Sequence, residues 1–447
     1  MSIKSVFIAN RGEIAVRIIR TCRVLGIETI LGVSQADQNS LGARLADRMT
    51  LIGPPPASTY LNIPNIISAA LEAGADAVHP GYGFMAERPE FAAACQSSGL
   101  IFIGPKAEHI DQMGNKLVAR ALAKTCGVPV LEGSDKVNSL DDVLAVVKDI
   151  GYPVMLKAAA GGGGRGMKII TEQDKDRLQS IFEEARAEAT AAFGDGSLYV
   201  EKYVAHARHI EVQVLGDKYS NAVHLGERDC STQRRHQKLI EEAGAPNISD
   251  ELRQSIHAAA LKLVRHISYE NAGTVEFVVD QDTETFYFLE MNTRIQVEHP
   301  VTEMVTGVDL VQEQIRVANG EALPFRQEDI SFNGHAIECR INAESPENGF
   351  SPSPGIISRW EAPGGPGVRL DTHCSQGYQI PIFYDSLIAK LITYGQDRDH
   401  ALRRMLGALD EFAIEGISTT TSYLRKVLQS TAFREGKVHT RLLETIG

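Results

Sequence analysis

Two acidic residues and an amide stand at strand-like spacing within residues 273–300. Apolar and polar residues alternate on both sides of a turn-rich break at residues 281–285, which predicts a β-hairpin. In this hairpin Glu276 lies directly opposite Glu290, and Asn292 lies two residues further along the same face. Carboxylate and carboxamide oxygens are the ligands that Mg²⁺ and Mn²⁺ prefer, often with substrate phosphates completing the shell. The alternative is a solvated face whose acids point into water.

The register of this hairpin follows from pairing Asp280 with Phe286. The pairing predicts that Val278 and Phe288 share the acidic face and that the opposite face is apolar. The apolar face is then formed by Val275, Phe277, Val279, Tyr287, Leu289 and Met291.

Polar side chains continue beyond the hairpin. Arg294, Gln296 and Glu298 are separated by single apolar residues, so a guanidinium, an amide and a carboxylate lie on one side of an extended run. Such a set can grip an anion and place a base beside it. Residues 276–298 are therefore predicted to join a metal site to an anion site.

Length and composition indicate a multidomain enzyme of ordinary globular type. The chain has 447 residues, of which 23% are charged and 43% hydrophobic. Its net charge of −12 argues against nucleic-acid binding. The six cysteines are scattered without a CxxC pair, so neither a zinc site nor a disulfide framework is predicted, and free thiols fit a reducing cytosol. With no signal segment and no membrane-spanning apolar run in the sequence, a cytoplasmic location without membrane association is expected.

The order of the expected elements divides the chain into five parts. Strand and helix alternate over residues 1–104, which predicts a Rossmann-like parallel α/β domain, and a helical connector follows over 105–130. Residues 131–203 have their own helices and strands and are expected to form an inserted lid. Residues 204–330 form a central domain with the acidic hairpin, and residues 331–447 form a C-terminal mixed β domain.

A glycine-rich run at residues 161–166 follows the expected strand that ends near Lys157. The run satisfies GxGxxG literally, but a strand is expected after it instead of the helix that a dinucleotide site needs, and the Gly-Lys-Ser/Thr of a P-loop is missing. A glycine-rich hairpin tip has bare backbone N–H groups that can fold over phosphate oxygens. The neighbouring Lys157, Arg165 and Lys168 favour phosphate binding over the alternative of a flexible surface loop.

The most polar stretch of the chain spans residues 226–242, between apolar strands and ahead of the acidic hairpin. A solvated charge run is the usual interpretation of such a segment. Its position also suits a role in gripping anions, and spacing alone leaves both interpretations open. The candidate anion-binding residues are Arg228, Gln233, Arg234, Arg235, His236 and Lys238.

The sequence combines Lys116, Lys157 with GGGGRGM, EKY at 201–203, RDCSTQRRHQK at 228–238 and EMNTRIQVEHPVTEM at 290–304. This combination resembles the biotin carboxylase family, a branch of the ATP-grasp superfamily, and the resemblance spans essentially the whole chain. It implies an α/β ATP-grasp fold with a parallel N-terminal domain, an inserted glycine-rich lid and a C-terminal mixed β domain.

The resemblance also implies roles for individual residues. ATP would be bound by Lys116, Lys157, Gly163, Gly164, Arg165, Gly166, Glu201, Lys202, Val204, His209, Gln233, His236 and Val278. Two divalent ions, Mg²⁺ or Mn²⁺, would be held by Glu276, Glu290 and Asn292. Bicarbonate and biotin would be bound by Lys238, Arg294, Gln296, Val297, Glu298 and Arg340. Among these the catalytic residues would be Lys238, Arg294, Glu298 as the base, and Arg340 facing the ureido oxygen of biotin.

The implied reaction is ATP-dependent carboxylation of biotin N1′ through carboxyphosphate. The chain has no Ala-Met-Lys-Met segment, so the biotin carboxyl carrier protein and the carboxyltransferase are expected to be separate proteins. Acetyl-CoA is the default final acceptor, with propionyl-CoA, pyruvate and urea as alternatives. Two other functions are weighed: an ATP-grasp carboxylate–amine ligase of the carbamoyl-phosphate type, and a non-catalytic nucleotide-binding regulator.

One departure from the family bears on assembly. Dimeric relatives carry an acidic and an aromatic residue at interface positions that hold Val24 and Pro366 here. The resemblance therefore leaves the homodimer open.

Overall fold

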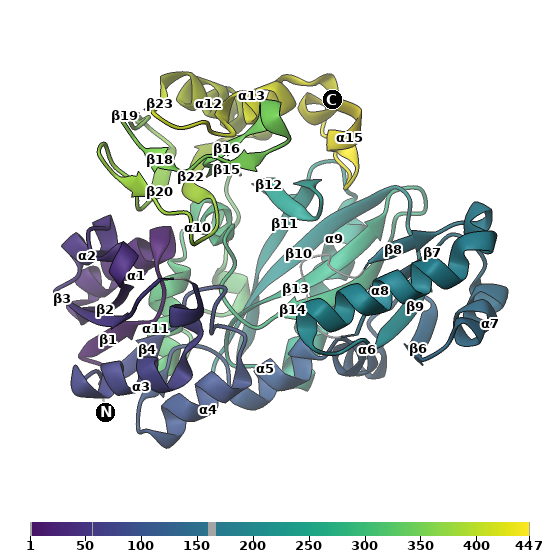
Figure 1. The fold of residues 1–447 in the computed structure, drawn as a ribbon, viewed down its shortest axis with the longest axis horizontal. Coiled ribbons are helices and arrows are strands. Elements are labelled where there is room, and N and C mark those ends of the chain that lie inside the picture. Colours follow the sequence, from purple (N-terminus) through teal and green to yellow (C-terminus); the bar gives the residue numbers. More distant parts are fainter. Residues whose placement is uncertain (1, 56, 160–166, 447) are drawn as a thin grey trace.

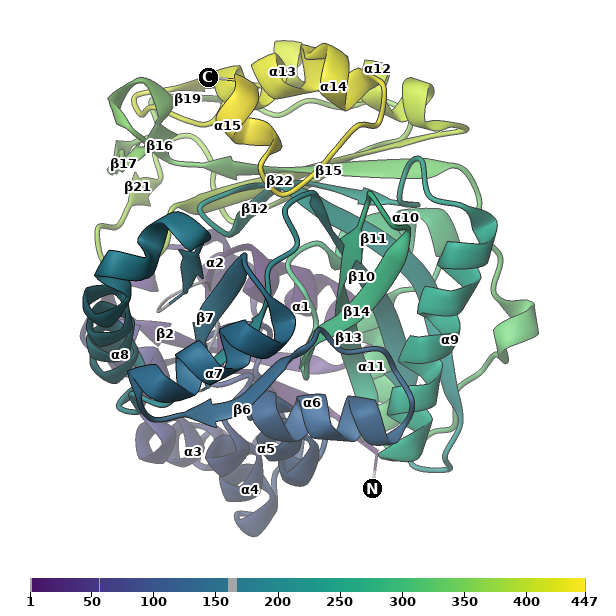
Figure 2. The ribbon, with the colours of Figure 1, turned by 90° about the vertical axis from the view of Figure 1, so that its right-hand side faces the viewer.

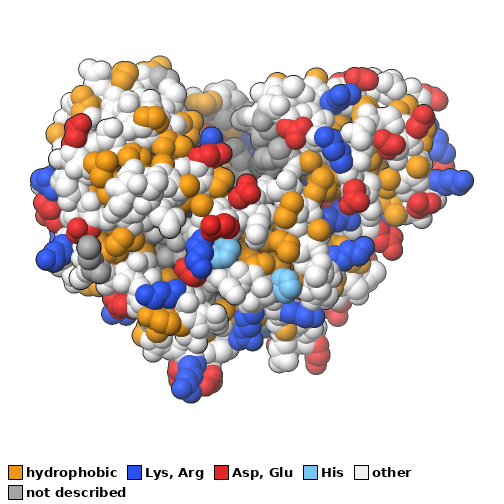
Figure 3. Space-filling view, turned by 90° about the horizontal axis from the view of Figure 1, so that it is seen from below, with side chains coloured by type: hydrophobic (Ala, Val, Ile, Leu, Met, Phe, Trp, Pro, Cys, Tyr) orange, Lys and Arg blue, Asp and Glu red, His pale blue; other side chains and the backbone are white. Residues whose placement is uncertain are grey.

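The computed structural model describes residues 2–55, 57–159 and 167–446. Figure 1 shows the N-terminal region in purple and blue, the lid region beside the central sheet, and the C-terminal region in green and yellow above them. Figure 3 shows one face of the molecule, on which acidic and basic side chains are interspersed. No helix among the described residues is both long and apolar enough to cross a membrane.

The N-terminal region is a parallel α/β unit, as predicted. Its sheet has the order β3-β2-β1-β4-β5, with all neighbours parallel. The strands are β1 (Ser5–Ile8), β2 (Glu28–Ser34), β3 (Arg48–Gly53), β4 (Ala77–His79) and β5 (Ile101–Phe102). The helices are α1 (Gly12–Leu25), α2 (Leu41–Leu45), α3 (Ile63–Glu72) and α4 (Pro89–Ser97).

Two helices, not one, form the connector. α5 (Ala107–Gly114) and α6 (Lys116–Thr125) are separated by Asn115, whose extended backbone ends the first helix. The Asn115 side chain accepts hydrogen bonds from the backbone N–H groups of Leu117 and Val118 and so caps α6. Lys116 therefore stands at the start of a helix.

The lid region is a small antiparallel sheet with helices packed on it. Its strand order is β6-β9-β7-β8, and the predicted strand after the glycine run is confirmed as β8. The glycine run lies between β7 and β8, outside the described residues. The elements are β6 (Gly133–Val137), α7 (Leu140–Ile150), β7 (Val154–Ala158), β8 (Lys168–Ile170), α8 (Leu178–Phe193) and β9 (Leu198–Lys202).

The main sheet has eight antiparallel strands in the order β14-β13-β10-β11-β12-β15-β22-β20. Because β12 pairs with β15, one sheet runs without a break from the acidic hairpin into the C-terminal region. The strands are β10 (Ala207–Gly216), β11 (Ala222–Arg234), β12 (Gln237–Ala243), β13 (Asn271–Asp280), β14 (Thr285–Asn292), β15 (His335–Asn342), β20 (Val368–Thr372) and β22 (Leu387–Gly395).

Helices cover this sheet and leave one region of it facing the lid. α9 packs on β10 and β11 over an apolar cluster, and α12 packs on β15 and β22 (Figure 2). Three two-stranded ribbons, β16 with β17, β18 with β21 and β19 with β23, border the C-terminal region. The helices are α9 (Asp250–His266), α10 (His299–Thr306), α11 (Leu310–Ala318), α12 (Arg398–Glu411), α13 (Thr421–Gln429), α14 (Thr431–Arg434) and α15 (Leu442–Ile446). The ribbon strands are Glu344–Ser345, Ser351–Pro352, Gly355–Ile356, Gln379–Ile380, Arg359–Glu361 and Ala413–Glu415.

The acidic hairpin is confirmed, but the predicted pairing of Glu276 with Glu290 is present only because a β-bulge interrupts the strand pairing. Glu276 faces Glu290, while Asp280 faces Thr285 instead of the predicted Phe286. The register shifts by one residue beside Glu276, which leaves Leu289 as the extra residue of β14.

The bulge exchanges the environments of two apolar side chains. Phe288 packs in the apolar core at 5% exposure, and Leu289 lines the large cavity of the molecule. Tyr287 pairs with Val278 and so shares its side of the sheet. The predicted faces of Phe288, Leu289 and Tyr287 were therefore wrong. The backbone N–H of Phe288 donates to the carbonyl of Pro129 in the connector, a contact that local alternation cannot predict.

Candidate active site

A cavity of about 1320 Å³ lies between the lid, the main sheet and the N- and C-terminal regions. It brings together nearly all the described residues that the sequence analysis selected. The selected residues that line it are Lys116, Lys157, Lys168, Glu201, Lys202, Val204, His209, Gln233, Arg235, His236, Lys238, Glu276, Val278, Glu290, Asn292, Arg294, Gln296, Val297 and Arg340. Arg228 and Arg234 do not line it. Glu298 lies just behind the cavity wall, and Gly163, Gly164, Arg165 and Gly166 lie outside the described residues.

The polar segment at residues 226–242 forms the hairpin of β11 and β12 and is largely buried. Arg235 and His236 make its turn with positive φ angles of 48° and 65°, and Gln233 pairs with Lys238 next to the turn. Arg228 is fully buried and donates from Nε to Glu211 Oε1 at 2.5 Å. The interpretation as a solvated charge run was therefore wrong, because most of these strand positions face packed neighbours.

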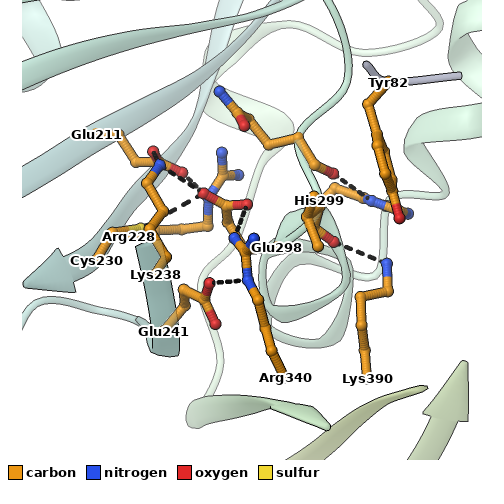
Figure 4. Close-up of polar contacts among 12 residues, drawn as sticks. Tyr82, Glu211, Arg228, Cys230, Lys238, Glu241, Glu298, His299, Arg340 and Lys390 are labelled. Atoms are coloured by element: carbon orange, nitrogen blue, oxygen red, sulfur yellow. Dashed lines mark hydrogen bonds and ion pairs between the residues drawn. The ribbon is translucent and has the colours of Figure 1, made fainter. Parts of the chain in front are cut away.

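Lys238 contacts three carboxylates at the centre of the site, two of them visible in Figure 4. Its Nζ lies 2.6 Å from Glu211 Oε2, 2.7 Å from Glu298 Oε1 and 3.1 Å from Glu276 Oε1. Burial lowers the pKa of Lys238, but Cys230 and the three carboxylates outweigh burial and hold this pKa well above its ordinary value. The ammonium group is thus the charge that allows three acids to gather around one point.

Glu298 is fully buried and held from two sides (Figure 4). Besides the contact with Lys238, its Oε2 accepts a hydrogen bond from Nη2 of Arg340 at 2.9 Å. Arg340 is itself oriented by Glu241, whose Oε1 accepts from Nε at 2.5 Å. Burial raises the pKa of Glu298, but Lys238, Arg340 and Arg228 hold it well below its usual range. The side chain is therefore an ionised carboxylate, the form that accepts a proton.

Two carboxylates and a carboxamide meet at the hairpin end of the cavity. Glu276 Oε1 accepts a hydrogen bond from Asn292 Nδ2 at 2.8 Å, and its Oε2 lies 2.8 Å from His209 Nε2. Glu290 Oε2 lies 3.3 Å from Lys116 Nζ. These oxygens fit a hard divalent cation, because opposed carboxylates otherwise repel one another. Binding through Asn292 would need its amide to turn, since its nitrogen now faces Glu276.

Arg294 connects this acidic end to the segment after the hairpin. Its Nη1 donates to Gln296 Oε1 at 2.9 Å and its Nη2 to Asn292 Oδ1 at 3.3 Å. Its Nε lies 2.9 Å from a carboxylate oxygen of Glu87, which comes from the N-terminal region and was not predicted. Arg294 and Gln296 therefore present a guanidinium and an amide to the cavity in fixed orientations.

The lid contributes two lysines in different states. Lys157 is buried, and its Nζ lies 2.6 Å from Glu201 Oε1. Burial lowers the pKa of Lys157, but Glu201, Tyr199 and Glu290 together outweigh burial and raise it. The Nζ of Lys202 instead donates to the backbone carbonyls of residues 150, 151 and 152 at 3.0, 3.2 and 3.1 Å. The ammonium of Lys202 is thus engaged by the lid's own backbone.

Several residues of the network were missed in the sequence. Glu211 follows His209 by two positions on β10, so strand alternation was enough to place both on one face. The others offered no local signal, because their partners are distant in the chain. These residues are Glu13, Glu87, Glu241 and Lys390.

The chain matches three family descriptions in succession. "Biotin carboxylase, N-terminal domain" covers residues 2–110, "Carbamoyl-phosphate synthase L chain, ATP binding domain" covers 115–326, and "Biotin carboxylase C-terminal domain" covers 338–445. Biotin carboxylase 1 of Bacillus subtilis (strain 168) is 51% identical over 445 residues, 99% of this chain and 98% of that protein. A pyruvate carboxylase subunit from Methanothermobacter thermautotrophicus is 50% identical over 441 residues, 98% of this chain and 89% of that protein.

A solved structure agrees with these matches. The biotin carboxylase domain dimer of Hydrogenobacter thermophilus 2-oxoglutarate carboxylase, in complex with MgADP, ADP and bicarbonate, matches with a TM-score of 0.96 at 48% identity. The match covers 100% of this chain and 98% of that chain. A small lid sheet facing a long antiparallel sheet across a cavity defines an ATP-grasp enzyme. The chain belongs to the biotin carboxylase family, which confirms the resemblance drawn from its motifs.

Proposed function

We propose that this protein carboxylates biotin N1′ on a biotin carboxyl carrier protein, using ATP and bicarbonate, through carboxyphosphate. The observation that supports this best is the position of Glu298. Its carboxylate is clamped between Lys238 and Arg340 at 2.7 and 2.9 Å, directly behind a cavity wall formed by Arg294, Gln296 and Arg340. A base held by two cations beside an anion grip suits deprotonation of bicarbonate.

The hairpin end of the cavity would hold the phosphates of ATP together with divalent ions. Glu276, Glu290 and Asn292 supply the oxygens for Mg²⁺ or Mn²⁺, which would neutralise the phosphate charge. Lys116 and Lys157 would turn from their present partners, Glu290 and Glu201, toward the phosphates. The ATP site would also include His209, Gln233, His236, Val204, Val278, the backbone of Glu201 and Lys202, and residues 163–166 of the lid.

Substrate binding would switch on the base by redistributing the cations. In the free protein Lys238 and Arg340 lower the pKa of Glu298, which makes it a weak proton acceptor. When Lys238 pairs with the γ-phosphate and bicarbonate, and Arg340 with the biotin ureido oxygen, Glu298 loses both stabilising contacts. Its pKa then rises toward the range in which a carboxylate removes a proton efficiently.

The later steps use the same residues. Carboxyphosphate would break down to CO₂ and phosphate within the cavity, where Arg294 and Gln296 keep the anions in place. The released phosphate would take the N1′ proton of biotin, which leaves negative charge on the ureido oxygen, and Arg340 is placed to stabilise it. The nitrogen then attacks CO₂ to give carboxybiotin.

The test is ATP hydrolysis measured against bicarbonate concentration, with and without biotin. We expect turnover to require bicarbonate and to rise when biotin is added. A carboxylate–amine ligase of the carbamoyl-phosphate type would respond to ammonia and not to biotin. A nucleotide-binding regulator would bind ATP without turnover, so either result would overturn the proposal.

The final acceptor is proposed separately from the half-reaction. We propose acetyl-CoA, delivered through a separate carboxyltransferase, while two similar proteins are named for pyruvate and 2-oxoglutarate carboxylation. Purification of the biotinylated carrier with its bound carboxyltransferase, followed by assays with each acceptor, decides among them. Carboxylation of pyruvate or 2-oxoglutarate in place of acetyl-CoA would overturn this part alone.

Assembly needs its own measurement. The Hydrogenobacter structure is described as a dimer. Here Val24 on α1 is 81% exposed. The family resemblance implies an acidic residue at this position in dimeric relatives and an aromatic residue at the position of Pro366. Light scattering of the purified protein distinguishes monomer from dimer.

A further inference from the structure

Lys390 is a fully buried lysine that binds the backbone of the segment after the acidic hairpin (Figure 4). It lies on β22 directly across from Arg340 on β15. Its Nζ donates a hydrogen bond to the carbonyl oxygen of Val297 at 2.7 Å. A charged donor on a backbone carbonyl makes a stronger and shorter hydrogen bond than a neutral one, so this contact fixes the peptide between Val297 and Glu298.

The neighbouring carbonyl in the segment is held as well. The oxygen of Gln296 lies 2.7 Å from Nδ1 of His299, a buried side chain in the first turn of α10. Burial lowers the pKa of His299 well below its ordinary value, so the ring is neutral and Nδ1–H is its donor. The consecutive carbonyls of Gln296 and Val297 are thus bound to buried side chains. These contacts fix the backbone that orients the side chains of Gln296 and Glu298.

The counter-ion of Lys390 comes from the opposite end of the sequence. Glu13, in the first turn of α1, has Oε1 at 3.1 Å from Lys390 Nζ, and the same oxygen accepts a hydrogen bond from the hydroxyl of Tyr82. The ring of Tyr82 also lies beside the ammonium, with its centroid 5.9 Å away. Lys390 therefore joins the N-terminal region, the C-terminal region and the segment at residues 296–298.

We propose that Lys390 is a positioning residue for bicarbonate, acting through the Val297 carbonyl to set the orientation of Gln296 and Glu298. This inference rests on the proposed function of the cavity. The simpler alternative is that Lys390 only neutralises the buried carboxylate of Glu13. Burial raises the pKa of Glu13 and Lys390 lowers it, so without Lys390 the carboxyl group tends to take up a proton.

Two variants separate these roles. Lys390→Met removes both the donor to Val297 and the partner of Glu13. Lys390→Met combined with Glu13→Gln also removes the carboxylate that Lys390 contacts, so neither member of this pair is left without its partner, while the Val297 carbonyl stays unbound. Replacing both members of a buried pair is far less damaging to stability than removing one.

We expect the KM for bicarbonate to be about tenfold higher or more in both variants, because a small misplacement of a binding group strongly reduces the efficiency of a reaction. The KM for ATP is expected to stay unchanged, since the metal and phosphate residues are not touched. The double variant is expected to recover the unfolding temperature that the single variant loses. Recovery of the bicarbonate KM together with stability, or an equal rise of both KM values, would show that Lys390 serves only to neutralise Glu13.

A direct binding measurement and a control complete the design. Bicarbonate should raise the unfolding temperature of the wild type and have a much weaker effect on both variants. Arg398→Met is the matched control, because Arg398 pairs with the buried Glu242 at 2.7 Å. It should lower the unfolding temperature and leave the bicarbonate KM unchanged; a raised KM in this control would overturn the positioning role. Absence of bicarbonate-dependent turnover in the wild type would instead refute the proposed function.

Discussion

Two neighbouring glutamates on β12 point to opposite faces of the main sheet, and their surroundings differ in charge. Glu241 faces the cavity side, where it lies opposite Glu338 and binds Arg340. Burial raises its pKa to about 7, because Arg340 offsets burial only in part and Glu298 adds repulsion. Glu242 faces the other side, where Arg398 and His335 bind it.

The pKa of Glu242 moves in the opposite direction. Burial again raises it, but the hydrogen bonds and charges of His335 and Arg398 outweigh burial and lower it to about 2. Two carboxylates of one strand, both at most 2% exposed, thus differ in proton affinity because of their partners alone. On the face of β12 away from the cavity, Glu242 is fully paired with cationic side chains. The cavity face has more carboxylates than its cationic side chains can neutralise.

The excess of acid on the cavity face is visible at Glu338. Neither of its carboxylate oxygens has a hydrogen-bond partner within the described part of the chain, although the residue is completely buried. Burial raises the pKa of Glu338 well above its ordinary value. Buried acids without hydrogen-bond partners lower stability, so this arrangement indicates a functional site. The predictions below test this difference between the two faces.

The largest effect is expected for Glu298→Gln. The amide keeps the size of the side chain but cannot accept the bicarbonate proton, so bicarbonate-dependent ATP hydrolysis should fall by about 10²- to 10⁴-fold. The unfolding temperature should fall, because Lys238 and Arg340 hold the pKa of Glu298 well below its usual range and the ionised carboxylate therefore stabilises the folded protein at neutral pH. A variant with near wild-type turnover would exclude Glu298 as the base.

Glu290→Gln is expected to have the next largest effect. Removing one of the opposed carboxylates should raise the Mg²⁺ concentration for half-maximal turnover and lower turnover by about 10- to 100-fold, as for other losses in a metal site. Titration of activity with Mg²⁺ and Mn²⁺ measures both quantities. An unchanged metal dependence would contradict the assignment of the hairpin as the metal site.

The same hairpin shows how far local sequence patterns reach. Alternation and a short turn predicted the two paired strands, because strand periodicity and turn length are local properties. The pairing of Glu276 with Glu290 was correct only because the bulge offsets the one-residue error in the predicted partner of Asp280. The bulge at Leu289 was not predictable from alternation, since it accompanies the contact of Phe288 with the distant Pro129. The parallel arrangement of the N-terminal strands, but not their order in the sheet, followed from strand–helix–strand repetition.

The candidate site likewise contains residues that the sequence revealed and residues that it did not. The roles of Lys238 and Arg340 were taken from the family resemblance, and Glu298 was also selected by alternation after the hairpin. The structure places all three in one network. Glu13 and Lys390 were missed because they meet only after the two ends of the chain pack together. Residues that act through a partner distant in sequence carry no local pattern, whatever their burial or charge.

Glu241→Gln should have a smaller and more selective effect. Arg340 would keep its contact with Glu298 but lose the charge of the second carboxylate that orients it. We expect biotin-dependent turnover to fall by about tenfold, comparable to the loss of one charged hydrogen bond. ATP hydrolysis in bicarbonate without biotin should be unchanged. Equal losses in both assays would assign Glu241 to the whole site and not to Arg340.

The smallest effect is a difference in the pH dependence of stability. The folded pKa of Glu242 is about 2, below its ordinary value of 4.5, so its stabilising contribution is present above pH 4.5 and is lost as pH falls toward 2. Glu242→Gln should therefore be less stable than the wild type at neutral pH, by about 3 kcal/mol at most. The difference in unfolding temperature should shrink as the pH is lowered.

Glu241→Gln should give the opposite trend in the same experiment. The folded pKa of Glu241 is about 7, above the ordinary value of 4.5, so its contribution is present below pH 4.5 and is lost as pH rises through 7. Relative to the wild type, this variant should gain stability as the pH rises across that range. Parallel pH profiles for the two variants would mean that both faces of β12 balance their charges equally. Profiles of opposite slope would show that only the cavity face holds acid in excess.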